Sequence, residues 1–233
     1  MQVSVLSGGA AQGLLEALAE EFKRRTGHAI AGSFGAVGAM REKLLAGAAC
    51  DLVILTSGMV ADLARDGHVE AATSTDIGIV RTALAVPSGD TIPKVDSAEA
   101  LGGVVHAASS LFFPDPQRAT AGIHFAKVLA ALGISGPALD KKAEIHANGT
   151  AAMRALAHAG GGRALGCTQA TEILSTPGVT LIGPLPAPFE LATVYSIGVS
   201  ASAAAPEPAR ALAALLTAPE GESLRARLGF EPL

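Results

Sequence analysis

Residues 51–58 read Asp-Leu-Val-Ile-Leu-Thr-Ser-Gly, and this stretch decides the fold. Four consecutive apolar residues at 52–55 are typical of a strand buried on both faces of a sheet. The hydroxyls of Thr56 and Ser57 favour a helix start, and the apolar spacing continues that helix to Leu63. A strand that leads directly into a helix is the repeating unit of an α/β protein.

The same unit occurs twice earlier in the chain. A strand at 3–6 leads through a Gly-rich turn into a helix closed by Gly27, and a strand at 29–34 leads into a helix closed by Gly47. Three such units predict an α/β fold class with a parallel sheet that helices cover. In sheets of this kind, ligands bind at the carboxyl ends of the strands, where the helices begin.

The three turns between strand and helix supply the first candidate binding residues. Small residues let a ligand approach the backbone N–H groups of a helix start, where the helix dipole favours an anion. The alternative is that the glycines serve tight packing and the hydroxyls serve only as helix caps. The candidates are Ser7, Gly8, Gly9, Ala10, Gly35, Ala36, Val37, Thr56 and Ser57.

Residues 113–129 form a further helix start with polar character. They run from an apolar strand end through a Pro-rich turn into a helix, and Thr120 is the predicted N-cap. Arg118 could bind an anion or instead pair with Asp115. His124 lies one turn into the helix and is either a candidate catalytic residue or an ordinary helix-face residue. The candidate ligand residues here are Arg118, Thr120, Ala121 and Gly122.

A short helix predicted at 168–174 follows a strand at 164–167, and Thr168 is its predicted cap. Thr168 and Gln169 complete the candidate ligand set, since an amide side chain can both donate and accept hydrogen bonds. The remaining pattern predicts a strand at 142–146, a helix capped by Asn148, and two closing helices near 206–216 and 219–228.

Composition excludes several function classes. Of 233 residues, 49% are apolar and 16% charged, so the chain can build a large core, and the net charge of −4 argues against nucleic acid. No apolar run approaches the roughly 18 residues of a membrane span. Cys50 and Cys167 stand far apart, and the histidines and acidic residues have no metal-binding spacing, so we expect no metal and no cofactor.

The amino terminus reads straight into a strand, without the basic segment or cleavage site of a secretory signal. We therefore expect the chain as written to be cytoplasmic, and periplasmic if a signal peptide was removed. We also expect a monomer.

Several short segments carry a family resemblance through their order and spacing. They are 3–6, 20–27 (Glu-Glu-Phe-Lys-Arg-Arg-Thr-Gly), 33–35, 45–54, Pro114-Asp-Pro with Ala121-Gly-Ile, Gly166 with Gln169, and 228–230. In this order the chain resembles the molybdate-binding substrate-binding proteins of ABC transporters, within the type II periplasmic binding proteins. The resemblance covers nearly the whole chain.

The resemblance implies two α/β lobes joined by two hinge strands, with the ligand cleft between them. Lobe 1 would comprise residues 1–80 plus 192–233, and lobe 2 residues 81–191. The ligand would be a small anion held by hydroxyls and by backbone N–H groups at helix starts. An ABC permease would be the partner if the protein is exported.

Three ligand positions depart from that family. The usual serines fall at Ala10 and near Ala36, and the usual tyrosine falls at Gln169. Two hydroxyl donors and a phenol are thus replaced, while Arg118 can grip a carboxylate with two parallel bonds. We therefore expect binding of a small di- or tricarboxylate, or less favourably an oxyanion.

Two other functions are considered. Aconitate isomerase resembles the same family, so a cytoplasmic isomerase that shifts an allylic proton is the main alternative. It would use His124 or another residue as the base, Arg118 as a clamp and helix starts to stabilise developing charge. A cytoplasmic sensor is a third function, for which the sequence offers no DNA-binding segment.

Overall fold

The computed structural model describes residues 2–160 and 162–233, which form two compact units. Lobe 1 consists of the described part of Met1–Val80 together with Thr193–Leu233, and lobe 2 consists of Arg81–Ala192. Strand β4 (Thr75–Pro87) carries the chain from lobe 1 into lobe 2. The chain returns to lobe 1 at the beginning of strand β9 (Ala192–Val199).

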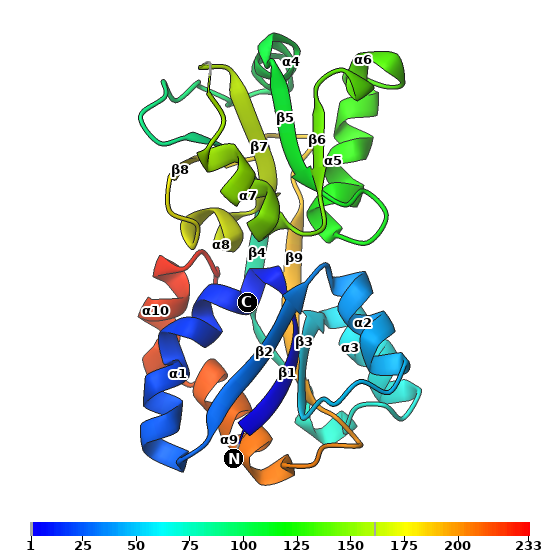
Figure 1. The fold of residues 1–233 in the computed structure, drawn as a ribbon, viewed down its shortest axis with the longest axis vertical. Helices are drawn as coiled ribbons and strands as arrows, with labels where there is room; N and C mark the ends of the chain where they lie inside the picture. Colours follow the sequence, from blue (N-terminus) through cyan, green and yellow to red (C-terminus); the bar gives the residue numbers. More distant parts are fainter. Residues whose placement is uncertain (1, 161) are drawn as a thin grey trace. The chain divides into compact units, whose positions relative to one another are not determined.

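Lobe 1 contains the three strand–helix units predicted from the sequence. Its strands lie in the order β2-β1-β3-β9, in which the first three are parallel and β9 is antiparallel to β3. Figure 1 shows α1 on one side of these strands and α2 and α3 on the other. The elements are β1 (Gln2–Gly8), a 3-10 turn η1 (Gly9–Ala11), α1 (Gln12–Thr26), β2 (Ala29–Gly35), α2 (Val37–Leu45), β3 (Leu52–Thr56) and α3 (Ser57–Arg65).

The core of lobe 1 follows directly from the apolar pattern. The side chains at 52–55 are all fully buried, as expected for a strand covered on both faces. Helix α1 ends as predicted at Gly27, which adopts a left-handed φ of 75° and donates its N–H to the Lys23 carbonyl at 2.8 Å. The remaining elements of lobe 1 are the 3-10 turns η2 (Ala71–Thr73) and η3 (Pro219–Gly221) and the helices α9 (Pro206–Thr217) and α10 (Glu222–Arg227).

Lobe 2 has a mixed sheet in the order β4-β7-β5-β6, and β8 pairs with β4. Strand β5 is parallel to β6 and β7, whereas β4 runs antiparallel to β7 and β8. The strands are β5 (Ser110–Pro114), β6 (Ala143–His146), β7 (Ala164–Gln169) and β8 (Val179–Pro184). The helices are α4 (Ala98–Ala107), α5 (Thr120–Ala131), α6 (Pro137–Asp140), α7 (Gly149–Ala157) and α8 (Ala170–Leu174).

Two apolar clusters cover the two faces of the lobe 2 sheet. Along β4, Leu84 and Val86 join the cluster of α4 and α5, whereas Ala83 and Ala85 join the cluster of α7 and α8. This alternation is the two-residue period of a strand. Burial of both faces explains why residues 83–86 of β4 and 111–113 of β5 read as unbroken apolar runs, and the arrangement confirms the predicted α/β fold class.

None of the described helices is both long enough and apolar enough to cross a membrane.

Candidate functional site

In lobe 1, the strand register brings the three predicted turns together. Gly8 of β1 pairs with Gly35 of β2, and Ser7 pairs with Ile54 of β3, two residues before Thr56. The turns that follow these strands therefore lie side by side at the carboxyl edge of the sheet. Every candidate predicted in this half of the chain, from Ser7 to Ser57, belongs to that edge.

The helices at this edge begin without a side-chain cap. The N-cap of α2 is Ala36 and the N-cap of η1 is Gly8, neither of which has a side-chain acceptor. Thr56 is the N-cap of α3, but its hydroxyl accepts no capping hydrogen bond. The first N–H groups of these helices are therefore left to an outside acceptor, which is the arrangement that attracts an anion.

Strand β9 adds residues that were not among the predicted ligands. Tyr195 pairs with Thr56 and is 2% exposed. A Cβ at Gly8 would come within 2.7 Å of Val37 and 3.3 Å of Tyr195, so Gly8 is needed for this close packing. The hydroxyl of Thr193, two residues before Tyr195, is buried and makes no hydrogen bond to the described residues.

In lobe 2, three helix starts also share one edge. Pro114 at the end of β5 pairs with His146 at the end of β6, and β7 runs parallel to β5 on the other side. The helices that follow these strands, α5, α7 and α8, begin at the carboxyl edge. The structure thus places the candidates at 118–122 and the pair Thr168 and Gln169 at one edge of lobe 2.

Two predicted helix caps are wrong by one residue. The N-cap of α5 is Ala119, because its carbonyl accepts the first intrahelical hydrogen bond from the N–H of Ile123 at 2.9 Å, and Thr120 becomes the first helical residue. The N-cap of α8 is Gln169, because strand pairing with Thr82 extends β7 to that residue. Thr168 therefore lies within β7 and caps no helix.

Other residues near the start of α5 have contacts of their own. Gly122 packs against the turn before the helix, where an added Cβ would lie 2.2 Å from the Pro114 carbonyl oxygen and 2.4 Å from that of Asp115. His124 Nε2 donates to the Phe189 carbonyl at 2.8 Å, because a carbonyl can only accept. The side chain of Arg118 is exposed and that of Thr120 is half-buried.

Gln169 is the most unusual polar side chain at this edge. It is 3% exposed, and neither its amide nitrogen nor its amide oxygen makes a hydrogen bond to any described residue. The hydroxyls of Thr82, opposite Gln169 on β4, and Thr171 are likewise buried without a partner. Native proteins satisfy nearly all buried polar groups, so these groups need partners from outside the described chain, such as water or a ligand.

Sequence analysis missed Glu172, which is 5% exposed. Thr168 Oγ1 donates to its Oε2 at 2.5 Å, and the backbone N–H groups of Gly149, Thr150 and Gln169 also donate to the carboxylate. Burial raises the pKa of Glu172, although these hydrogen bonds oppose that shift. Its position three residues after Gln169, in an otherwise uncharged segment (164–174), was the available signal.

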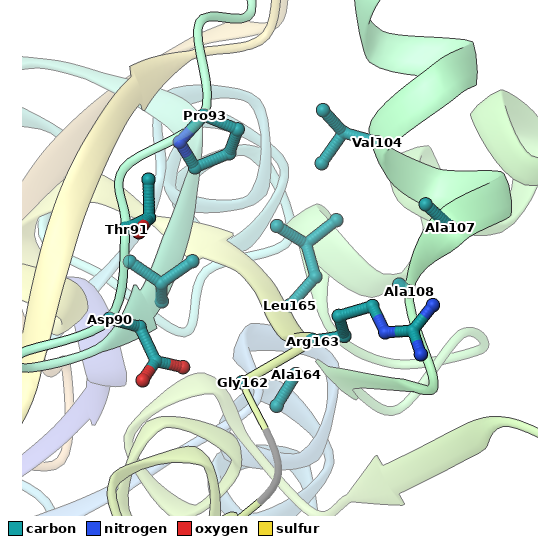
Figure 2. Close-up of a pocket in the computed structure, with 11 residues that line it drawn as sticks. Asp90, Thr91, Pro93, Val104, Ala107, Ala108, Gly162, Arg163, Ala164 and Leu165 are labelled. Carbon is teal, nitrogen blue, oxygen red and sulfur yellow. The ribbon is translucent and has the colours of Figure 1, made fainter.

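A cavity of about 260 Å³ lies at the opposite edge of lobe 2. Figure 2 shows apolar side chains around it, with the Asp90 carboxylate and the Arg163 guanidinium on its two sides. Ala164 and Leu165 line it at the amino end of β7, about 16 Å along the strand from Gln169. It is therefore separate from the predicted site, and no predicted ligand residue lines it.

The chain's two cysteines are buried and unpaired, as predicted. Burial raises the pKa of Cys50 to about 11 and the pKa of Cys167 well above its ordinary value, so both remain unreactive thiols near neutral pH. In the described ranges, no group of three or more His, Cys, Asp and Glu side chains is placed to hold a metal ion.

Comparisons with known proteins agree with this architecture. The model of the family described as bacterial extracellular solute-binding protein matches residues 3–231. An aconitate isomerase from a Pseudomonas species is 25% identical over 237 residues, which cover 99% of this chain and 88% of the relative.

Two solved structures share the fold. The periplasmic molybdate-binding protein of Azotobacter vinelandii has a TM-score of 0.81 and 19% identity, with 99% of each chain covered. The sulfate-binding protein SubI of Mycobacterium tuberculosis H37Rv has a TM-score of 0.72 and 16% identity, covering 100% of this chain and 87% of the other. These likenesses confirm the periplasmic-binding-protein fold class.

Proposed function

The chain belongs to the family of bacterial extracellular solute-binding proteins, and we propose that its solute is a small di- or tricarboxylate rather than an inorganic oxyanion. The observation that carries this proposal is the row of helix starts at the carboxyl edge of each lobe. Helices α2 and α5 both have an alanine as N-cap, so their first N–H groups have no acceptor from the cap residue. Such groups suit an anionic ligand.

The side chains around these helix starts favour a carboxylate. Ala10 and Ala36 occupy positions where the molybdate-binding proteins that the sequence resembles have serines. They are 3% and 5% exposed and offer no hydroxyl. A tetrahedral oxyanion needs donors on all sides, and the two missing hydroxyls reduce that set. Gln169 instead offers an amide that both donates and accepts, which suits an organic acid with several different polar groups.

A thermal-shift screen tests the ligand class. The purified protein is heated with molybdate, tungstate, sulfate, citrate, cis-aconitate or trans-aconitate, each at several concentrations. A ligand that binds only the folded state raises the Tm, because it adds RT ln(1 + L/Kd), with L the free ligand concentration, to the free energy of unfolding. We expect the largest shifts with the carboxylates. A shift with molybdate and tungstate alone would show that the preference for carboxylates is wrong.

A gain-of-function variant sharpens the same test. The double substitution Ala10→Ser and Ala36→Ser restores the two hydroxyls at the helix starts of lobe 1. We expect the affinity for molybdate or sulfate to rise about thirtyfold relative to citrate, because two neutral donors contribute about 1 kcal/mol each. An unchanged ratio would mean that these positions do not contact the ligand. The exposed position Ala61, in α3, provides the serine control.

The aconitate isomerase relative favours a second candidate, the isomerisation of a small tricarboxylate. Because His124 Nε2 donates to Phe189, its Nδ1 would be the basic nitrogen in that reaction. The test follows the vinyl proton of trans-aconitate by NMR in D₂O with a high concentration of protein. Interconversion or deuterium exchange that His124→Ala abolishes would support the isomerase, and the absence of both would exclude it.

For location and partner, the family's description as extracellular favours the exported alternative, with an ABC permease as the partner. Fractionation of the native cells with an antibody against this protein tests that choice. Recovery with the cytoplasmic fraction would instead favour the isomerase.

A further inference from the structure

The carboxylate of Glu172 occupies the beginning of α7. The N–H groups of Gly149 and Thr150, the first two residues of that helix, donate to it. Asn148 completes the arrangement, because its Oδ1 accepts from the N–H of Ala151 at 2.9 Å. The N-terminus of α7 is therefore neutralised by the protein's own side chains, and a ligand cannot use the same donors.

Gly149 shows how closely Glu172 is fitted into this position. An added Cβ would lie 1.9 Å from Glu172 Oε2 and 2.0 Å from Thr168 Oγ1, far inside normal contact distance. The Thr168 hydroxyl gives its proton to Glu172 and faces Gly149. The proton of the Thr168 hydroxyl is therefore already used in the hydrogen bond to Glu172.

Gln169 is the neighbour with unused hydrogen-bonding capacity. Its backbone N–H donates to Glu172, whereas its buried amide has no partner in the described chain. A ligand group beside this amide would lie close to the buried carboxylate. When Glu172 is ionised, it would repel a second negative charge placed there, because water screens charges poorly inside a protein. An uncharged group avoids that cost.

We infer that Glu172 determines which ligand group can bind beside the Gln169 amide. Its carboxylate disfavours a second negative charge there, so that group is uncharged and hydrogen-bonding, and the solute is a hydroxycarboxylate. This inference rests on the proposed carboxylate-binding function. The hydroxyl of such a ligand donates to the amide oxygen of Gln169 or accepts from its nitrogen, and its carboxylates bind the uncapped helix starts. Glu172 acts here as a positioning residue, because its carboxylate places a negative charge next to Gln169.

Two pairs of acids that differ by one hydroxyl test this inference. Isothermal titration calorimetry compares citrate with tricarballylate, and malate with succinate. We expect the hydroxylated acid of each pair to bind at least about tenfold more tightly, because its partner leaves the Gln169 amide unsatisfied. Gln169→Leu should bring the ratio close to one by weakening the hydroxylated acid. The same substitution at exposed Gln2, outside the candidate site, is the matched control.

Glu172→Gln tests the role of the charge. Gln can keep the shape of Glu172, donate to Thr168 and accept from the backbone N–H groups. Without the negative charge, tricarballylate should gain several-fold in affinity and the preference for citrate should shrink. Circular dichroism confirms that each variant is folded, and the wild-type ratios test the inference even if a variant is not.

The outcomes separate this inference from the proposed function. Equal wild-type affinities within each pair would overturn the inference while carboxylate binding stands. Loss of both acids to the same extent in Gln169→Leu would also overturn it. If no carboxylate binds to the wild-type protein, the proposed function itself fails.

Discussion

Helices α7 and α5 begin at the same edge of lobe 2, but a side chain caps the N-terminus of α7 and none caps that of α5. Asn148 caps α7 and Glu172 accepts from its first N–H groups, whereas the N-cap of α5 is Ala119. Both starts contain a glycine that permits close contact. Gly149 lets the Glu172 side chain approach, and Gly122 lets the preceding backbone approach.

This difference distinguishes a structural helix start from a binding one. The unpaired N–H groups at a helix start need an acceptor, and α7 has one built into the fold. Because α5 has no cap side chain, an acceptor for it must come from water or a ligand. The number of helices that point at an edge therefore overestimates the number of anion contacts that the edge can make.

The largest expected effect comes from closing the space beside Glu172. Gly149→Ala forces a methyl group against the carboxylate and Thr168, and should lower the free energy of unfolding by about 2–4 kcal/mol. Urea denaturation followed by circular dichroism measures it. Gly103→Ala is the control, because Gly103 lies in α4 with no atom near its missing Cβ, and there alanine should stabilise by up to about 1 kcal/mol. Equal effects would refute the close fit.

The charge of Glu172 should appear in the pH dependence of stability. Its pKa is raised above 4.5 in the folded protein, so its contribution to stability is complete below about pH 4.5 and is lost as pH rises through the raised pKa. Relative to Glu172→Gln, the wild type should lose at most about 1.4 kcal/mol per pH unit in that window. Urea denaturation between pH 4 and 8 measures it.

Neighbouring ionisable groups leave this expectation unchanged. Of the residues on adjacent elements, Arg154 and His158 of α7 are exposed, Cys167 of β7 stays a thiol, and His146 of β6 stacks on Phe112. None of them contributes to the pKa shift of Glu172. If the free energy of unfolding changed with pH in the same way for the wild type and Glu172→Gln, ionisation of the buried carboxylate would carry no cost in stability.

Removing the cap of α7 should cost less. Asn148→Ala leaves the N–H of Ala151 without its acceptor, and the expected loss is about 1 kcal/mol in the free energy of unfolding. The affinity for citrate should change little, because the first N–H groups of α7 are not expected to contact the ligand. A large loss of affinity with an intact fold would place α7 in the binding site after all.

The smallest effect should come from giving α5 the cap that it lacks. Ala119 has the extended backbone of an N-cap, so Ala119→Ser can accept from the first turn and should stabilise the protein by about 0.5–1 kcal/mol. The new hydroxyl competes with a ligand for the same donors and should weaken citrate binding about threefold. Calorimetry and urea denaturation on one protein preparation measure both. Tighter binding would contradict the role of α5 as an open anion contact.

Much of the fold could be predicted because strands such as β3 are buried on both faces and helices such as α1 and α7 have a clear apolar stripe. The run at 52–55 and the closing Gly27 needed no tertiary information. The cap at Thr168 could not be placed, because pairing with Thr82 decides where β7 ends, and the cap at Thr120 was one residue late because α5 begins from the Ala119 carbonyl. Glu172 was missed for a similar reason, since two of its donors, Gly149 and Thr150, come from the start of α7, more than twenty residues earlier in the sequence.

The alanines that line one face of the lobe 2 sheet have a consequence for selectivity. Ala83, Ala85 and Ala164 present only methyl groups toward α7 and α8. Such small side chains let α7 and α8 pack closely on the sheet, and in this packing Glu172 of α8 is 5% exposed. A single enlargement, such as Ala85→Leu, would wedge the layer apart and hydrate that carboxylate. The choice of solute would then depend on the thickness of a hydrocarbon layer that the solute never touches.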